Sequence, residues 1–167
     1  MDDAIRKAEA LIEAGSHIRM FRNRLTVIKL GGSAMEDPAA LEATLQDVAF
    51  METVGLRPVL VHGGGRAIDR AMAQAGLQPR KVQGRRVTDD AALEIVVRVL
   101  TQETDGLVEQ LRLLGAQSIP VYDRGLQCLF GEWLTLPGPE GRPLDLGHVG
   151  RVTHVNAALL EALAAGG

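Results

Sequence analysis

Aromatic residues, cysteine and long hydrophobic runs are all scarce in this chain. Aromatic residues make up 3% of the sequence, so Leu, Val, Ile and Ala must build most of the core. A single cysteine, Cys128, excludes an internal disulfide and favours a reducing compartment. No apolar stretch approaches the roughly 18 residues that a membrane span needs. The first residues also lack the basic and apolar segments of a secretion signal, so we expect a cytoplasmic protein with no membrane partner.

Strong charge and closely spaced metal ligands are missing as well. The formal net charge is −3, which gives no electrostatic case for a nucleic-acid partner. The carboxylates are scattered, and His62, His148 and His154 are too far apart for local ligand spacing, so we expect no metal site. The composition is that of an ordinary globular protein, and 167 residues are enough for one domain with its own core.

Strand and helix patterns alternate over most of the chain. Residues 3–20 carry an apolar stripe at helical spacing and predict a helix before the first strand, with Gly15 as a place for a kink. This apolar stripe must be buried, either against its own domain or against another subunit. Strands are expected at 25–30, 57–61 and 118–122, and antiparallel strands within 126–136 and 150–155. Helices are expected to start at Asp37–Pro38 and at Asn156, and to cover residues 66–75 and 89–114, the last with a break at Gly106. This order predicts an α/β fold with a parallel sheet and helices on both faces.

Two glycine runs are the most informative motifs. Leu25-Thr-Val-Ile-Lys-Leu-Gly-Gly32 and Val61-His-Gly-Gly-Gly-Arg66 each read as a buried strand that opens towards a helix. A lysine inside an apolar strand, here Lys29, is costly unless an anion meets it, and glycines let backbone N–H groups approach a ligand. Neither run matches the P-loop or the dinucleotide fingerprint. The runs therefore predict an anion site, most plausibly for phosphate; the alternative is a pair of tight strand-to-helix turns.

Three further residues have chemistry that a site could use. Arg86, in Gly84-Arg-Arg-Val-Thr88, presents a rigid fork that fits a carboxylate, although most loop arginines are simply solvated. His62, directly before the glycines, is interpreted as structural rather than catalytic. Cys128 has no sequence sign of activation and is expected to be a buried core thiol.

Four motifs together resemble those of N-acetylglutamate kinases, which belong to the amino acid kinase superfamily. They are Val27-Ile-Lys-Leu-Gly-Gly32, Val61-His-Gly-Gly-Gly65, Gly84-x-Arg-Val-Thr88 and Asp145-Leu-Gly-His-Val-Gly150, in the family's order. The resemblance covers essentially the whole chain from residue 25 onwards. The helix that ends near Phe21-Arg22 also resembles the N-terminal helix of the arginine-inhibited, hexameric members.

The resemblance implies a fold and an activity. The fold would be an αβα sandwich with a mainly parallel central sheet, a β-hairpin lid from the strands within 126–155, and an appended N-terminal helix. Residues 1–22 would be an oligomerisation arm for a homo-oligomer, dimer or hexamer, and residues 23–167 an acetylglutamate-binding domain. The activity would be ATP-dependent phosphorylation of the γ-carboxylate of N-acetyl-L-glutamate in arginine biosynthesis, with Mg²⁺ carried by ATP.

The resemblance also implies roles for single residues. Lys29 would be catalytic and would offset charge on the phosphoryl group in transfer. Gly31 and Gly32 would face the ATP phosphates. Gly64 and Gly65 would donate N–H groups to acetylglutamate, and Arg86 would bind one of its carboxylates.

The chain departs from the family pattern in two segments and in length. Residues 101–106 and 122–125 lack stretches that many members carry, and family members are considerably longer. We therefore expect the chain to be the acetylglutamate-binding half without the ATP-binding C-terminal half, and to be inactive alone. The alternatives are a non-catalytic amino-acid-binding or regulatory module of this fold, or another member such as a carbamate, aspartate or uridylate kinase.

Overall fold

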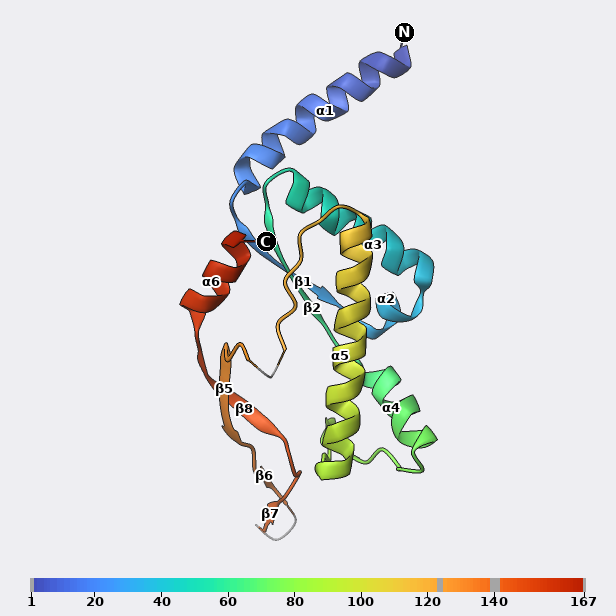
Figure 1. Ribbon diagram of the computed structural model, residues 1–167, viewed down its shortest axis with the longest axis vertical. Helices are drawn as coiled ribbons and strands as arrows, with labels where there is room; N and C mark the ends of the chain where they lie inside the picture. The colour runs from blue at the N-terminus through green and yellow to red at the C-terminus, as the bar shows by residue number, and fades with distance from the viewer. Residues whose placement is uncertain (1, 123–124, 139–141, 167) are drawn as a thin grey trace. The chain divides into compact units, whose positions relative to one another are not determined.

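The computed structural model describes residues 2–122, 125–138 and 142–166 (Figure 1). The helices are α1 (Asp2–Phe21), α2 (Gly32–Glu36), α3 (Pro38–Thr53), α4 (Gly65–Gln74), α5 (Asp90–Leu113) and α6 (Ala157–Gly166). The strands are β1 (Leu25–Leu30), β2 (Arg57–His62), β3 (Lys81–Val82), β4 (Arg85–Arg86), β5 (Leu129–Trp133), β6 (Leu136–Pro137), β7 (Pro143–Leu144) and β8 (Gly150–Val155). No helix in these ranges is both long and apolar enough to cross a membrane.

The chain divides into two compact units. The first unit comprises Met1–Val61, Glu109–Ile119 and Glu161–Gly167, and the second comprises His62–Val108 and Pro120–Leu160. Both units are assembled from segments that are distant in sequence.

The first unit contains α1 and a β–α–β segment. Helix α1 ends as expected near Phe21, because Asn23 takes the left-handed conformation (φ 60°) and its N–H donates to the Gly55 carbonyl at 2.7 Å. Strands β1 and β2 pair in parallel and are joined through α2 and α3. The Asp37 carboxylate caps α3 by accepting from the N–H groups of Ala39 (3.0 Å) and Ala40 (3.2 Å), which confirms the predicted helix start.

The second unit has its core between α4 and the part of α5 that it contains. Helices α4 and α5 lie beside each other in Figure 1. The buried residues of this core are Ile68, Met72, Ala92, Ile95 and Val99. Asp89 caps α5 by accepting from the Ala92 N–H at 2.8 Å. Helix α5 continues through Gly106, so the break expected there is wrong; a single glycine in a helix interior costs only about 1 kcal/mol.

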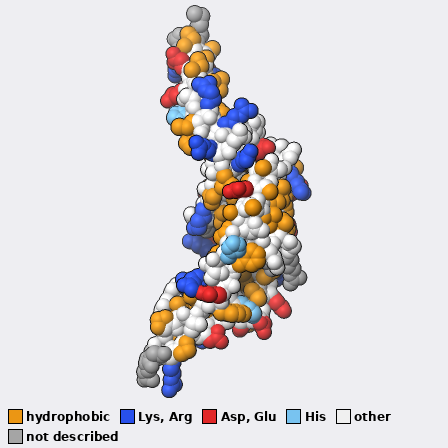
Figure 2. Space-filling view, turned by 90° about the vertical axis from the view of Figure 1, so that its left-hand side faces the viewer, with side chains coloured by type: hydrophobic (Ala, Val, Ile, Leu, Met, Phe, Trp, Pro, Cys, Tyr) orange, Lys and Arg blue, Asp and Glu red, His pale blue; other side chains and the backbone are white. Residues whose placement is uncertain are grey.

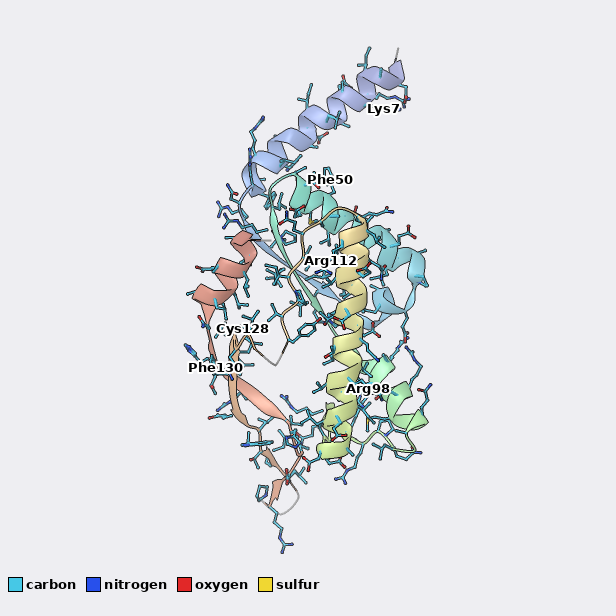
Figure 3. The ribbon with its side chains drawn as sticks, viewed as in Figure 1. Lys7, Phe50, Arg98, Arg112, Cys128 and Phe130 are labelled. Atoms are coloured by element: carbon cyan, nitrogen blue, oxygen red, sulfur yellow. The ribbon has the colours of Figure 1, made fainter. Side chains whose placement is uncertain are left out.

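The second unit also contains the antiparallel strands that the sequence indicated. Strands β5 and β8 pair antiparallel, with an irregular register between Phe130 and Gly131, and β6 pairs with β7. Cys128 and Phe130 lie at the start of β5 in Figure 3. The Cys128 thiol is free and buried, as expected. The Asn156 side chain caps the following helix, α6, by accepting from the Leu159 N–H at 3.1 Å, which confirms that helix start.

Some expectations about strands and sheets are wrong. Residues 118–122 form no strand, and β5 begins at Leu129 instead of residue 126. Among the described residues the sheets are four two-stranded pairs, of which β1–β2 is the parallel one, so the wide parallel sheet of a sandwich stays a prediction. An apolar run predicts burial but not the strand that it pairs with, since pairing depends on distant parts of the chain.

Candidate functional site

A tight hairpin sets up the charged part of the site. Gln83 (φ 50°) and Gly84 (φ 77°) form the two-residue turn between β3 and β4, and positive φ at both positions is the signature of a type I′ turn. The register pairs Lys81 directly with Arg86. Directly opposed residues of an antiparallel pair share a face of the hairpin, so two positive charges are held next to each other.

Asp69 lies between these two cations. One of its oxygens, Oδ1, is 2.5 Å from Arg86 Nη2, and the other, Oδ2, accepts from Lys81 Nζ at 3.1 Å. Each carboxylate oxygen thus meets a different positive charge, which offsets the repulsion across the hairpin. We call Asp69, Lys81 and Arg86 the Asp69 cluster.

The pKa of Asp69 reflects this arrangement. Burial raises the pKa, but the hydrogen bonds from Arg86 and Lys81, together with their charges, outweigh burial and hold the pKa below its ordinary value of 3.8. Asp69 is therefore ionised at neutral pH. The cluster then carries two positive charges and one negative charge, so an anionic ligand still meets a net positive site.

The Arg86 guanidinium is fixed against the first turn of α4. Its side chain is 13% exposed, compared with 52% for the Lys81 side chain. Nη2 donates to the Gly65 carbonyl at 3.3 Å, and Nη1 contacts the Met72 sulfur at 3.2 Å. Arg86 is thus in direct contact with the glycine turn and is more than a solvated loop arginine.

The glycines of this turn have different roles. A Cβ built on Gly64 would come within 2.9 Å of the Leu100 side chain, so glycine at this position permits close packing on α5. A Cβ on Gly65 would meet no described atom within 4 Å, so the space beside this residue is open. The turn is thus packed against the protein at Gly64 and accessible at Gly65.

His62 ends β2 immediately before the glycines. Its Nε2 lies 2.9 Å from Thr104 Oγ1, which in turn donates to the Leu100 carbonyl at 2.9 Å. Its other ring nitrogen, Nδ1, is buried and has no hydrogen-bond partner among the described residues. The contact with α5 agrees with the structural role expected for His62.

Two of the family-like motifs lie side by side at Thr88. The Thr88 N–H donates to the Leu146 carbonyl at 2.8 Å, and the Thr88 carbonyl accepts from the His148 N–H at 2.6 Å. Gly147 (φ 69°) makes this possible, because a Cβ there would lie 2.1 Å from the Thr88 carbonyl oxygen. The start of β8 is thus tied to the strand that carries Arg86. The role of the 126–155 strands as a lid stays a prediction.

The structure corrects the environment of Lys29. Lys29 lies on β1 as predicted, but its side chain is exposed, and burial alternates along the strand instead of being continuous. Successive side chains of a strand point to opposite faces of the sheet, and Lys29 lies on the more exposed face of β1. Burial therefore does not support an anion at Lys29, and its proposed role rests on its position before Gly31 and Gly32. Cβ atoms built on these two glycines would meet no described atom within 4 Å.

The structure brings some of the predicted residues together and adds one that was missed. Gly64, Gly65 and Arg86 are adjacent in the second unit, whereas Lys29, Gly31 and Gly32 belong to the first. Sequence reasoning treated Asp69 as one of many scattered carboxylates. Its spacing was an available signal, because Asp69 lies one helical turn after Gly65 and so shares its face of the helix.

Comparison with known proteins is in line with these motifs. A model described as the amino acid kinase family matches residues 24–167, so the chain belongs to the amino acid kinase family. The chain is 38% identical over 149 residues to the acetylglutamate kinase of Akkermansia muciniphila, which covers 89% of this chain and 50% of that protein. It is 38% identical over 168 residues to the acetylglutamate kinase of Methanocaldococcus jannaschii, covering 98% of this chain and 56% of that protein. The chain thus spans about half the length of the curated relatives it matches.

Solved structures share the fold. N-acetylglutamate synthase from Neisseria gonorrhoeae, complexed with coenzyme A and N-acetyl-glutamate, superposes with a TM-score of 0.75 at 24% identity, over 95% of this chain and 35% of that one. The protein smu.665 from Streptococcus mutans superposes with a TM-score of 0.63 at 26% identity, over 85% of this chain and 55% of that one.

The lowered pKa of Asp69 makes a prediction about stability. A carboxylate whose pKa is lower in the folded state contributes stability that is present above its unfolded value and is lost as the pH falls through the folded value. We expect Asp69→Asn to lower the urea midpoint at pH 7, and the difference from wild type to narrow as the pH falls below 3.8. Urea unfolding between pH 7 and pH 3 measures this, and a difference that stays constant with pH would contradict it.

Proposed function

We propose that the protein to which this chain belongs phosphorylates the γ-carboxylate of N-acetyl-L-glutamate with ATP, as a step of arginine biosynthesis. The observation that supports this most directly is the position of Arg86, whose guanidinium is held against the Gly65 carbonyl in a cluster of net positive charge. Relatives named acetylglutamate kinase, 38% identical over most of the chain, support the choice of substrate.

Arg86 and the neighbouring glycines would bind acetylglutamate. The contacts of Arg86 engage Nη2 and one Nη1 hydrogen, and an arginine carries five N–H donors. Within the described part of the chain, Nε and the second Nη1 hydrogen thus stay available, and each can donate a single hydrogen bond to a ligand carboxylate. The Gly64 and Gly65 N–H groups belong to the start of α4, where the helix dipole favours negative charge.

Lys29, Gly31 and Gly32 would act on the phosphates of ATP. The transferred phosphoryl group develops charge on its equatorial oxygens, and an ammonium group can offset it. Exposure of Lys29 leaves its ammonium group accessible to such a ligand. A Mg²⁺ ion would arrive bound to the phosphates of ATP.

A direct assay tests the proposal. The protein expressed from its complete reading frame is incubated with ATP, Mg²⁺ and N-acetyl-L-glutamate, and ADP release is followed. We expect release that depends on acetylglutamate. Release with aspartate or carbamate instead would change the acceptor, and release with none of the three would contradict the proposal.

Arg86→Ala should mainly weaken acetylglutamate binding. A hydrogen bond between arginine and a charged carboxylate contributes about 1.5–3 kcal/mol, so we expect the KM for acetylglutamate to rise about 10- to 150-fold. The matched control is Arg85→Ala, the exposed neighbour on β4. Steady-state kinetics in which Arg86→Ala raises the KM for ATP instead would assign Arg86 to the wrong ligand.

Lys29→Ala should mainly slow the chemical step. Loss of one charge contact to the transition state costs roughly 3 kcal/mol, so we expect kcat to fall about a hundredfold with a smaller change in the KM for acetylglutamate. Lys7→Ala is the control, since Lys7 is an exposed lysine of α1 (Figure 3). A kcat close to that of wild type would end the assignment of Lys29.

Helix α1 would join copies of the chain into a homo-oligomer. Apolar side chains on α1 are strongly exposed, with Leu11 at 73% and Ile12 at 75%, and Figure 2 shows hydrophobic and basic side chains together on this helix. An exposed apolar stripe of this kind indicates a partner surface. We expect deletion of residues 2–21, or the double change Leu11→Ser and Ile12→Ser, to lower the mass measured by light scattering without unfolding the protein. An unchanged mass would contradict an assembly role for α1.

A further inference from the structure

We infer that Asp69 is a positioning residue for Arg86, whose carboxylate holds the guanidinium on the glycine turn in the orientation that receives the carboxylate of acetylglutamate. The inference rests on the proposed function, in which Arg86 binds that carboxylate. It adds a residue that does not itself touch the substrate.

The contacts of one guanidinium nitrogen define the orientation. Arg86 Nη2 donates to the Gly65 carbonyl at 3.3 Å and forms an ion pair with Asp69 Oδ1 at 2.5 Å, so both of its contacts are on α4. These acceptors are one helical turn apart, on one face of the helix. A hydrogen bond and an ion pair to one rigid element restrict the position of Nη2 more than a single contact could.

Arg86 would otherwise have little to keep it in this place. Its cross-strand partner is Lys81, and like charges directly opposite each other are unfavourable. Asp69 forms an ion pair with each of the two cations and so offsets the repulsion that would move their side chains apart. Without the carboxylate, Arg86 keeps the Gly65 carbonyl and the Met72 sulfur, which are weaker partners for a charged group.

Charge and positioning make opposite predictions for Asp69→Asn. The substitution raises the net charge of the Asp69 cluster from +1 to +2. If Asp69 acted only through its charge, an anionic substrate would bind more tightly to the variant. If Asp69 positions Arg86, the substrate binds more weakly, because the guanidinium loses its fixed orientation. The sign of the change therefore separates the two explanations.

Steady-state kinetics on the protein expressed from its complete reading frame measure this sign. For Asp69→Asn we expect the KM for acetylglutamate to rise about tenfold, with kcat and the KM for ATP changed far less. Asp47→Asn on α3 is the control, as the same chemical change at an exposed position. In an Arg86→Ala background, Asp69→Asn should have no further effect on this KM, because Asp69 acts through Arg86.

The outcomes separate the inference from the proposed function. A wild-type protein without acetylglutamate-dependent ADP release overturns both. An active wild type in which Asp69→Asn lowers the KM or leaves it unchanged overturns the inference alone, and so does a full additional effect in the Arg86→Ala background. If Asp69→Asn does not fold, Asp69→Glu replaces it: this variant keeps the charge but displaces the carboxylate, so a raised KM supports the inference and an unchanged KM overturns it.

Discussion

Two positive charges face each other across the β3–β4 hairpin, and the carboxylate of Asp69 lies between them. The type I′ turn at Gln83 and Gly84 brings Lys81 and Arg86 together, and their repulsion would open the hairpin or turn the side chains apart. Asp69, on α4, offsets this repulsion by forming ion pairs with both side chains, and these ion pairs connect the hairpin to α4. In our inference this interaction, together with the contacts to the Gly65 carbonyl and the Met72 sulfur, orients Arg86 in the carboxylate site proposed for the second unit.

Close backbone packing keeps the surroundings of the cluster in place. Gly64 allows α4 to approach Leu100 of α5, and Gly147 allows the segment before β8 to pair with Thr88. Thr88 follows β4 almost directly, so the hairpin is tied at its end to a second segment of the chain. At Gly147 a side chain would collide with the Thr88 backbone, which explains this glycine without reference to a ligand, whereas at Gly64 it would meet only the end of the Leu100 side chain. Gly65 differs, because the space beside it is open.

The two groups of proposed functional residues have different kinds of support. Arg86, Gly64 and Gly65 are joined by contacts within one unit, so their association has a physical basis in the structure. Lys29, Gly31 and Gly32 belong to the other unit, and Lys29 is exposed on a strand with a single neighbour among the described strands. Its proposed role follows from the family and from its place before a glycine turn, since burial no longer supports it.

The amino-acid sequence alone indicates the family, most of the elements in their order and most helix starts. Asp37, Asp89 and Asn156 cap the helices that follow them, because capping is a local interaction between a side chain and the next few N–H groups. The tertiary structure decided what depends on partners distant in sequence. It left Lys29 exposed, left residues 118–122 without a strand, and placed Asp69 between Lys81 and Arg86. Burial, strand pairing and the bridging of charges each require a second surface, and a local pattern does not specify which surface that will be.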